Sequence, residues 1–277
     1  HRKLSVFDGR VAFVGGINVL DDFDDGKSAA ARFDFAVRVE GPLVARIHAT
    51  MRHVWRPVRW ARLGRRPPPP AALPAAPAIG GTTAAALLIR DNLRHRRDIE
   101  NAYLAAIRSA RREIVISNAY FLPGRPFRGA LLAAAKRGVT VILLLQGRVE
   151  HVLQHYATQS LYDRMLSAGV RVFEYEDAFL HAKVAVIDGD WATVGSSNID
   201  PFSLLLAREA NVVVRDAAFA GQLRASLEAA IGGAAREIRP EDQRQRSWLE
   251  RLAGHAAYAV VRILVGVTRY AGKQYAD

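Results

Sequence analysis

Two segments of the chain carry the same pattern of histidine, lysine, aspartate and asparagine. Residues 1–18 read HRKLSVFDGRVAFVGGIN and residues 181–198 read HAKVAVIDGDWATVGSSN, with nine of the eighteen positions identical in an ungapped alignment. A single His-x-Lys on a strand carries little information. Two complete copies, with the aspartate, glycine and asparagine also repeated, are hard to attribute to chance.

The spacing of the first residues in each copy suits phosphate chemistry. Side chains at i and i+2 of a strand project from the same face, so His1 with Lys3, and His181 with Lys183, each point into one site. A lysine ammonium is a point charge for a phosphate oxygen. Because a neutral and a protonated imidazole coexist near neutral pH, two histidines can act as nucleophile and as general acid. Two such half-sites facing each other would surround one phosphorus atom.

The other repeated residues have expected roles as well. Asn18 and Asn198 supply amide donors at the ends of the two copies, and Ser196 adds a hydroxyl in the second copy only. Asp8 and Asp188 are each followed by glycine, a pair that favours tight turns. We therefore expect these two aspartates to hold a turn between strands more than to touch a substrate.

The two copies resemble the paired HxK(x)4D(x)6G[GS]xN motifs of the phospholipase D superfamily. This resemblance implies that one histidine attacks phosphorus and forms a phosphohistidine, while the other protonates the leaving alkoxide and then activates the acceptor. It implies no cofactor and no metal. By resemblance we assign His1 as nucleophile and His181 as general acid/base, an order that the residues themselves leave open. The motif residues expected to carry catalysis are His1, Lys3, Asp8, His181, Lys183 and Asp188.

An acidic residue follows each copy of the motif. Asp34 and Glu209 each stand just before an apolar segment. In the superfamily, an acid at these places is expected to hydrogen-bond a catalytic histidine and set its tautomer, as a buried acid does in other triads. The alternative is that both are charges at strand edges.

Longer segments narrow the resemblance to the shorter, B-type bacterial cardiolipin synthases. These segments are IRDNLRHRRDIE (89–100), NAYFLPG (118–124), LLLQGRVE (143–150), QHYATQSLYDRMLSAGV (154–170) and the block 181–214. The resemblance implies phosphatidyl transfer to phosphatidylglycerol from a second phospholipid, at the cytoplasmic face of the bacterial inner membrane. Asn118, Tyr120 and Arg148 follow predicted strands and are candidate substrate contacts, although Tyr120 could equally serve packing. We interpret His151 and His155 as a helix surface, with a substrate-facing His155 as the alternative.

The composition is compatible with this function and with a second one. Thirty-nine Lys and Arg against 27 Asp and Glu leave a net charge of +12, which favours an anionic partner such as a membrane surface or nucleic acid. Cysteine is absent, which excludes disulfides and thiol nucleophiles. We expect phospholipid substrates and no nucleic-acid partner. A nuclease using the same two histidines is the alternative, and a membrane-binding protein with a relic site is a third interpretation.

Hydrophobic patterns predict an α/β fold, with the two-lobed, helix-flanked mixed sheets of the phospholipase D superfamily. Strands are expected at 4–7, 11–14, 33–39, 113–117, 139–145 and 170–175. Helices are expected from Gly41-Pro42 to about Trp55 and at 98–112, 127–137 and 161–168. Near-continuous apolar strands such as 141–145 are typical of a sheet that helices cover on both faces. Alternation of strands and helices favours a layered α/β architecture.

The composition also divides the chain. A Pro- and Ala-rich linker is expected at 64–83. It separates 1–63, the C-terminal part of a first lobe, from a second lobe at 84–240, and 241–277 forms a C-terminal segment. The symmetry of the repeat predicts about as much chain before His1 as lies between the linker and His181. We therefore expect a fragment whose first lobe is truncated and which is poorly folded or inactive by itself.

Two segments have the composition of a membrane-binding surface. Residues 46–66 combine seven arginines with Trp55 and Trp60. On a helix near the C-terminus, Arg251, Arg262, Arg269 and Lys273 share one face, whereas Leu252, Ala256, Ala259, Ile263, Val267 and Tyr270 form a broad apolar face. The uncharged run between Arg251 and Arg262 is shorter than the roughly 20 residues that span a bilayer. We predict an interfacial helix; the alternative is a terminal helix that packs on the core with a solvated basic stripe.

Overall fold

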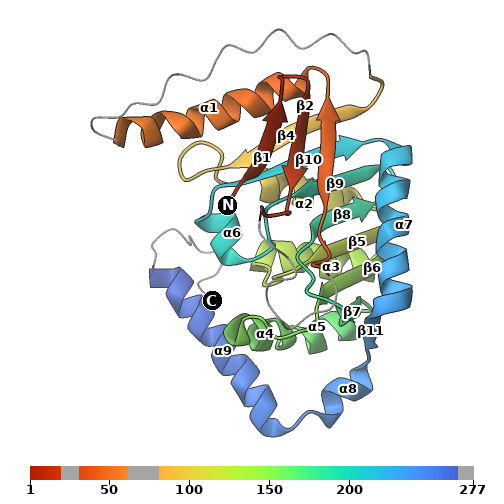
Figure 1. Cartoon of the computed structure of the whole chain (residues 1–277). Coiled ribbons are helices and arrows are strands. Elements are labelled where there is room, and N and C mark those ends of the chain that lie inside the picture. Colours follow the sequence, from red (N-terminus) through yellow and green to blue (C-terminus); the bar gives the residue numbers. More distant parts are fainter. Residues whose placement is uncertain (20–30, 62–80, 268–277) are drawn as a thin grey trace.

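The larger of two β-sheets has eight strands in the order β11-β7-β6-β5-β8-β9-β10-β4. The chain is represented by a computed structural model that describes residues 1–19, 31–61 and 81–267 (Figure 1). Strands β5, β6 and β7 run parallel to one another, and the remaining pairs are antiparallel. The strands are β4 (Ala84–Arg90), β5 (Glu113–Asn118), β6 (Thr140–Gln146), β7 (Arg171–Tyr175), β8 (Lys183–Ile187), β9 (Trp191–Gly195), β10 (Glu209–Arg215) and β11 (Ala235–Ile238).

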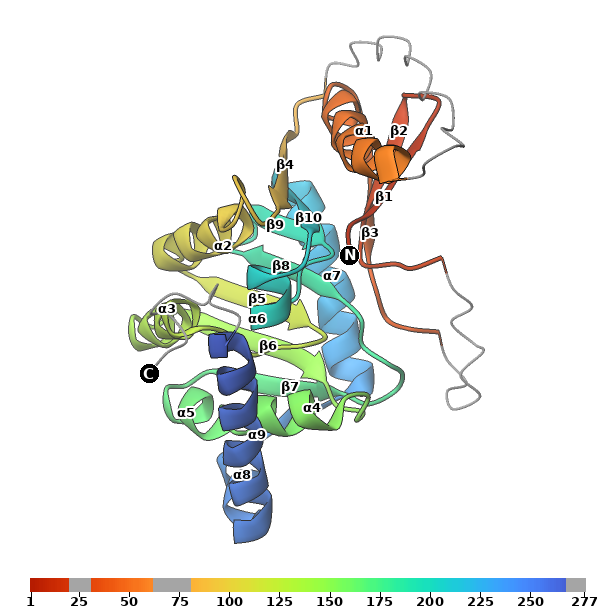
Figure 2. The ribbon, with the colours of Figure 1, turned by 90° about the vertical axis from the view of Figure 1, so that its left-hand side faces the viewer.

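The smaller sheet holds the first copy of the repeated motif. Its three antiparallel strands are β1 (Lys3–Phe7), β2 (Val11–Gly15) and β3 (Ala36–Glu40), in that order. They correspond to β8, β9 and β10 of the larger sheet, so the sequence repeat is also a repeat of structure. Helix α1 (Leu43–Ala61) follows β3. Figure 2 shows this small sheet and α1 standing beside the larger sheet.

Helices cover the larger sheet on both faces. They are α2 (Asp98–Ser109), α3 (Arg125–Lys136), α4 (Val152–Gln159), α5 (Tyr162–Ser167), α6 (Pro201–Leu205), α7 (Ala217–Ala234), α8 (Pro240–Gln245) and α9 (Trp248–Val267). Among the described residues, no helix combines the length and the apolar content needed to cross a bilayer.

Alternate residues of the central strands feed two separate cores. Ile114, Ile116 and Leu143 point to the face covered by α2, α3 and α5. Val115 and Ile142 point to the other face, where they pack with apolar residues of α7, of α1 and of the small sheet. Burying both faces explains why consecutive residues in the middle of these strands are apolar. The second core joins the two sheets and thereby fixes the two copies of the motif relative to each other.

The architecture confirms the predicted α/β class with helix-flanked mixed sheets. The predicted strands and helices are present with small shifts at their ends. The helix expected to reach Arg112 ends at Ser109, because the backbone N–H groups of Arg111 and Arg112 donate to the Asp188 carboxylate instead. Strand β4 was not predicted; it pairs with β10 at the edge of the larger sheet.

Parts of three predictions fall outside the described residues. Most of the expected linker at 64–83 is not described, and neither are Arg269, Tyr270 and Lys273 near the C-terminus. Of the basic and aromatic segment at 46–66, the described portion lies on α1, which extends beyond the expected end at Trp55.

Candidate active site

His181 is held in place by the segment that precedes β3. Phe33 forms a parallel bridge with Leu180, and the His181 N–H donates to the Phe33 carbonyl at 2.9 Å. This places the buried Asp34 carboxylate 2.7 Å from His181 Nδ1. An Nδ1–H donated to Asp34 leaves Nε2 of the imidazole unprotonated and free to exchange a proton with a substrate.

Gly16 makes room for this carboxylate. A Cβ atom at position 16 would lie 2.3 Å from Asp34 Oδ1, a distance that side chains do not tolerate. The corresponding position of the second copy is Ser196, whose neighbouring acid is the longer Glu209. The two half-sites therefore differ: a glycine accompanies aspartate in the first lobe, and a serine accompanies glutamate in the second.

His1 approaches the acid of the opposite lobe more loosely, as an ion pair without a hydrogen bond. Its Nδ1 lies 3.5 Å from Oε1 of Glu209, which is fully buried. Ser196 donates its hydroxyl to Glu209 Oε2 at 2.5 Å. Burial raises the pKa of Glu209 to about 7, and the Ser196 hydrogen bond acts in the opposite direction. Each histidine is thus paired with a carboxylate from the other lobe, so neither half-site is complete without its counterpart.

The two lysines are held next to the histidines of their own copies. Lys3 Nζ donates to the His1 carbonyl at 3.0 Å, and Lys183 Nζ donates to the His181 carbonyl. Lys183 is almost completely buried, and burial lowers the pKa of its ammonium to about 7, with Asp34 opposing the shift and Lys3 adding to it. A bound phosphate would supply the missing negative charge and favour the protonated lysine.

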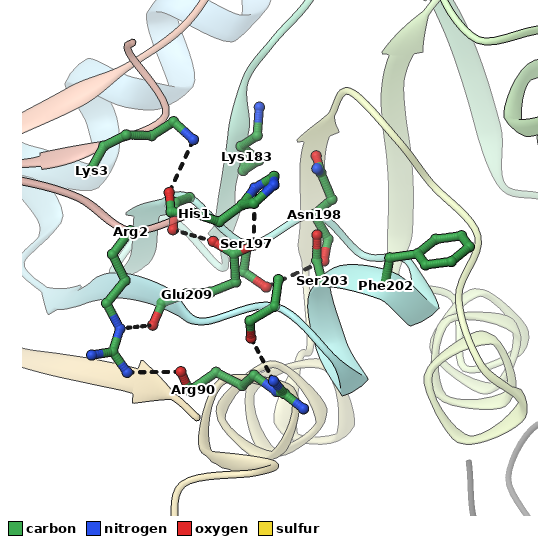
Figure 3. Close-up of polar contacts among 12 residues, drawn as sticks. His1, Arg2, Lys3, Arg90, Lys183, Ser197, Asn198, Phe202, Ser203 and Glu209 are labelled. Atoms are coloured by element: carbon green, nitrogen blue, oxygen red, sulfur yellow. Dashed lines mark hydrogen bonds and ion pairs between the residues drawn. The ribbon is translucent and has the colours of Figure 1, made fainter. Parts of the chain in front are cut away.

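Amide and hydroxyl groups complete the surroundings of His1. Figure 3 shows Lys3, Lys183, Ser197 and Asn198 gathered around the His1 ring. Asn198 is buried, and among the described residues its Oδ1 is a buried polar atom that has no hydrogen-bond partner. Asn18 ends the first copy and is only half-buried. The Asn198 amide is therefore available to a ligand at this site.

Asp8 and Asp188 lie at the far ends of the strands from the histidines. Both adopt the left-handed conformation, with φ of 50° and 52°, in the turns that join β1 to β2 and β8 to β9. The Asp188 carboxylate accepts hydrogen bonds from the backbone N–H groups of Arg111, Arg112 and Glu113 at 2.8–3.0 Å. These hydrogen bonds fit the turn-holding role that was expected of Asp188, and both turns lie at the opposite ends of the strands from His1 and His181.

A small polar cavity opens at the carboxyl ends of β5 and β6. Its lining includes Tyr120, Gln146, Glu150, Gln154 and His155. Gln146 Oε1 accepts from the Leu180 N–H at 3.2 Å, which places the cavity next to His181 in the chain. Among the described residues, Gln146 Nε2 and Gln154 Oε1 are buried without a hydrogen-bond partner. A donor and an acceptor are thus left for a polar ligand.

The expected substrate contacts Tyr120 and Arg148 both border this cavity. Tyr120 donates its hydroxyl to Glu150 Oε2 at 2.6 Å, and burial raises the pKa of the Tyr120 phenol. Arg148 donates to the carbonyls of Glu176 and Asp177 at 2.8 and 2.7 Å, so its guanidinium also holds the loop after β7.

His151 and His155 do not form a metal site with neighbouring acids. In the described ranges, no group of three or more His, Asp or Glu side chains is arranged to hold a metal ion. His155 lies on α4, and burial lowers the pKa of its imidazole. Its ring lines the cavity, which matches the substrate-facing alternative more closely than a solvated surface.

Sequence patterns missed several residues that build the site. Asn211 sits against Gly195, where a Cβ would come within 2.2 Å of its side chain, and its Oδ1 accepts the Ser197 N–H at 3.3 Å. Arg2 donates to the carbonyls of Glu209 and Arg90 at 3.0 and 2.8 Å (Figure 3). No sequence pattern pointed to Asn211 or Arg2. Glu150, which lines the cavity, follows the strand predicted at 139–145, and α/β proteins gather ligands at such strand ends.

Comparison with known proteins agrees with this geometry. Residues 103–231 match the family model described as "Cardiolipin synthase, PLD-like domain". The chain is 39% identical over 258 residues to cardiolipin synthase B of Escherichia coli K12, covering 90% of this chain and 59% of the relative. It is 32% identical over 229 residues to a probable cardiolipin synthase of Bacillus subtilis, covering 82% of this chain and 45% of that relative.

A solved structure has the same fold over nearly the whole chain. Phosphatidylserine synthase of Haemophilus influenzae Rd KW20 superposes with a TM-score of 0.64 at 11% identity, covering 98% of this chain and 70% of that one. The paired motifs, the matching family model and the similarity to the curated relatives agree with the resemblance to the phospholipase D superfamily. Within the superfamily its sequence is similar to the bacterial B-type cardiolipin synthases, as its flanking segments predicted.

Proposed function

We propose that the protein forms cardiolipin by moving a phosphatidyl group from one phospholipid to phosphatidylglycerol through a phosphohistidine. The observation that carries this proposal is the crosswise pairing of each imidazole with a buried carboxylate of the opposite lobe. Such pairing prepares two histidines for complementary roles at one phosphorus atom. The similarity to cardiolipin synthases supports the choice of substrates. Because the chain spans about three-fifths of the E. coli relative, the activity of the whole protein remains part of the proposal.

In the first half-reaction, His1 Nε2 attacks phosphorus of the donor phospholipid. A P–N bond forms and the P–O bond to the leaving alcohol breaks. His181 gives its Nε2 proton to the departing oxygen, so the alcohol leaves neutral. Glu209 stabilises the positive charge on the imidazole of His1, while Lys3 and Lys183 offset the charge that develops on the non-bridging oxygens.

In the second half-reaction, His181 is the base. It takes the proton from a glycerol hydroxyl of phosphatidylglycerol, and that oxygen attacks phosphorus. A new P–O bond forms, the P–N bond breaks, and His1 is released. Asp34 holds His181 in the tautomer that both half-reactions require, because its carboxylate accepts the Nδ1–H.

The cavity beside His181 has room for little more than one water-sized group and is the proposed site for a single hydroxyl of the acceptor headgroup. Free glycerol hydroxyls need one donor and one acceptor each. Gln146 Nε2 and Gln154 Oε1 supply such a pair. The neutral character of both amides suits an uncharged polyol more than an ammonium headgroup.

The proposed substrates are lipids, so the protein must act at a membrane. We place it as a peripheral protein on the cytoplasmic face of the bacterial inner membrane, where a surface with the chain's net charge of +12 would be attracted to anionic headgroups. The basic residues of α1 and the C-terminal helix are the segments proposed to make this contact.

The direct test is the incubation of full-length protein with labelled phosphatidylglycerol, with and without phosphatidylethanolamine, followed by separation of the lipid products. Labelled cardiolipin is expected. A His1→Ala variant should form no acid-labile phosphoenzyme and no product, and a His181→Ala variant should lose about 10²–10⁴-fold in rate.

A matched control is available outside the site. His95 contacts Asp98 at 2.7 Å, the same distance as the His181–Asp34 pair, but lies on the loop before α2. His95→Ala should leave transfer unchanged. Cleavage of DNA without any lipid turnover would instead identify a nuclease that uses the same two histidines.

A further inference from the structure

Helix α9 presents two different apolar faces. At roughly 100° per residue, Gly254, Ala257 and Val261 share one side of the helix, within about 60° of each other. Trp248, Leu252 and Ile263 share the opposite side within a similar arc. The first set is buried and the second is exposed. A helix that packs on a protein core by one side normally carries polar residues on the other.

The face of small residues fixes α9 to α4. Ala257 and Val261 pack in one cluster with Ala157 and Leu161 of the second lobe. A Cβ atom at Gly254 would lie 3.2 Å from the Tyr156 carbonyl, so glycine allows the close approach of the two helices. Besides the small residues, Val261 and the partly buried Tyr258 are the α9 side chains that pack in this contact.

The outward face is apolar along its whole length. Its large side chains are exposed by 44–71%: Trp248, Leu249, Leu252, Val260 and Ile263. Leaving this much apolar surface in water is unfavourable, and such faces mark contacts with proteins or membranes.

Basic groups border this face on one side. Arg251, His255 and Arg262 fall within about 40° of each other, next to the arc that holds Trp248. Arg251 donates to the Gln243 and Arg244 carbonyls, which bring the C-terminal end of α8 against the basic edge. On a bilayer, the apolar side chains and the tryptophan would enter the boundary between headgroups and acyl chains. The arginines at the edge would remain among anionic headgroups.

We propose that the outward face of α9 docks on an anionic lipid bilayer and holds the active site at the membrane surface. This proposal rests on the proposed function, because phospholipid substrates lie in a bilayer. The docking itself can be measured separately from activity. Helix α4 connects the two sites: one side packs on α9, and His155 and Gln154 line the cavity beside His181. Figures 1 and 2 show α9 crossing α4 on the outside of the larger sheet.

The first measurement is co-sedimentation of full-length protein with vesicles of phosphatidylglycerol and phosphatidylcholine, and with phosphatidylcholine vesicles as a neutral reference. Leu252→Glu/Ile263→Glu should lower the bound fraction at least tenfold. The matched control is Ala225→Glu/Ala229→Glu, which adds the same charges to exposed positions of α7. Arg251→Gln/Arg262→Gln should reduce the preference for phosphatidylglycerol while leaving binding at low salt measurable.

Trp248 gives a second, local readout. On addition of anionic vesicles its fluorescence should shift to shorter wavelength and be quenched by lipids brominated on the acyl chain. Trp248→Phe should remove this signal. Circular dichroism and thermal melting of each variant verify that the fold is retained.

Activity measurements separate docking from catalysis. On a short-chain, monomeric phospholipid, the Leu252→Glu/Ile263→Glu variant should retain the wild-type rate within about twofold. On vesicles, the same variant should lose its activity. His181→Ala should bind vesicles normally and be inactive on both substrates. Vesicle binding that requires α9, in a protein that turns over neither lipid, would contradict the proposed function and leave the docking surface intact.

Two outcomes would overturn the docking surface. In one, the double glutamate variant binds vesicles as the wild type does. In the other, light scattering shows a wild-type dimer that the same variant dissociates while vesicle binding is unchanged, which would make the outward face of α9 an interface between two copies of the chain.

Discussion

At the scale of single residues, the two half-sites use the same groups in different ways. His181 is bound tightly to a buried aspartate beside Gly16, whereas His1 approaches a glutamate that also holds the Ser196 hydroxyl. Glu209 is fully buried, and this burial raises its pKa to about 7. Unequal environments are a general means of giving two similar groups different roles.

Asp34→Asn should lower the rate of phosphoenzyme turnover by about 10²–10⁴-fold. The amide keeps the shape of the carboxylate but can present an N–H to His181 Nδ1, which favours the wrong tautomer and leaves Nε2 protonated. Single-turnover kinetics with the full-length protein measure the effect. The matched control Asp98→Asn alters the exposed His95 pair and should have none. Equal losses in both variants would argue against an orienting role for Asp34.

The dependence of kcat/KM on pH should be a narrow bell centred near 7. Glu209 must be ionised to support His1, and that requirement fails as the pH falls below its pKa of about 7. Lys183 must be protonated to hold phosphate, and that requirement fails as the pH rises above its pKa of about 7. Because bound phosphate favours the ammonium form, the alkaline limb of kcat alone should lie at higher pH.

Ser196→Ala should move the acidic limb to higher pH. The Ser196 hydrogen bond lowers the pKa of Glu209, so its removal raises that pKa and Glu209 is protonated sooner as the pH falls. Ser226→Ala on the exposed side of α7 is the control and should leave the profile unchanged. An acidic limb that stays in place after Ser196→Ala would assign that limb to another group.

At the scale of elements, two hairpins of the same design present the histidines. In each hairpin, the first strand begins at the motif lysine, next to the histidine. An Asp-Gly turn with positive φ then reverses the chain at the other end of that strand. In the second hairpin, Asp188 also fastens the turn to the start of β5 through three backbone N–H groups. Asp188 thus stabilises the hairpin that carries His181 and Lys183.

Asp188→Ala should destabilise the protein by about 2–3 kcal/mol, since three charge-assisted hydrogen bonds are lost and alanine disfavours the left-handed conformation. Denaturant unfolding measures this change. Asp190→Ala, an exposed neighbour in the same turn, should change stability by less than about 0.5 kcal/mol. The rate per folded Asp188→Ala molecule should equal that of wild type; a catalytic aspartate would instead abolish turnover.

At the scale of the whole molecule, the active site exists only where the two lobes meet. Shared apolar packing joins the small sheet to the larger one, and Arg2 adds a polar link: its guanidinium spans the carbonyls of Glu209 and Arg90, which are cross-strand neighbours in β10 and β4. The planar fork of arginine fits such a pair of acceptors, whereas a lysine ammonium does not.

Arg2→Lys should therefore lower kcat by about tenfold by loosening the lobe that carries His1 from the lobe that carries Glu209. Arg10→Lys, an exposed change on the β1–β2 turn, is the control. If Arg2 serves only stability, both variants should show wild-type kcat at temperatures where they are fully folded. A loss of kcat in the folded Arg2→Lys protein, with the pH profile altered on its acidic side, supports the positioning role.

The sequence by itself determined the chemistry and the local geometry. The repeated His-x-Lys spacing defines which side chains share a face of a strand, and Asp-Gly defines the turn, because both depend on residues that are close along the chain. The apolar runs likewise predicted the buried strands. Only the tertiary structure decided which acid serves which histidine, since Asp34 and His181 are 147 positions apart and their contact depends on how two sheets pack.

The same limit applied to the C-terminal helix. Its pattern predicted an apolar and a basic face, and Leu252 and Ile263 of that apolar face are exposed. The pattern did not show that Gly254, Ala257 and Val261 would pack on α4. How closely these side chains approach another helix depends on the shape of that helix, which is settled only when the chain is folded.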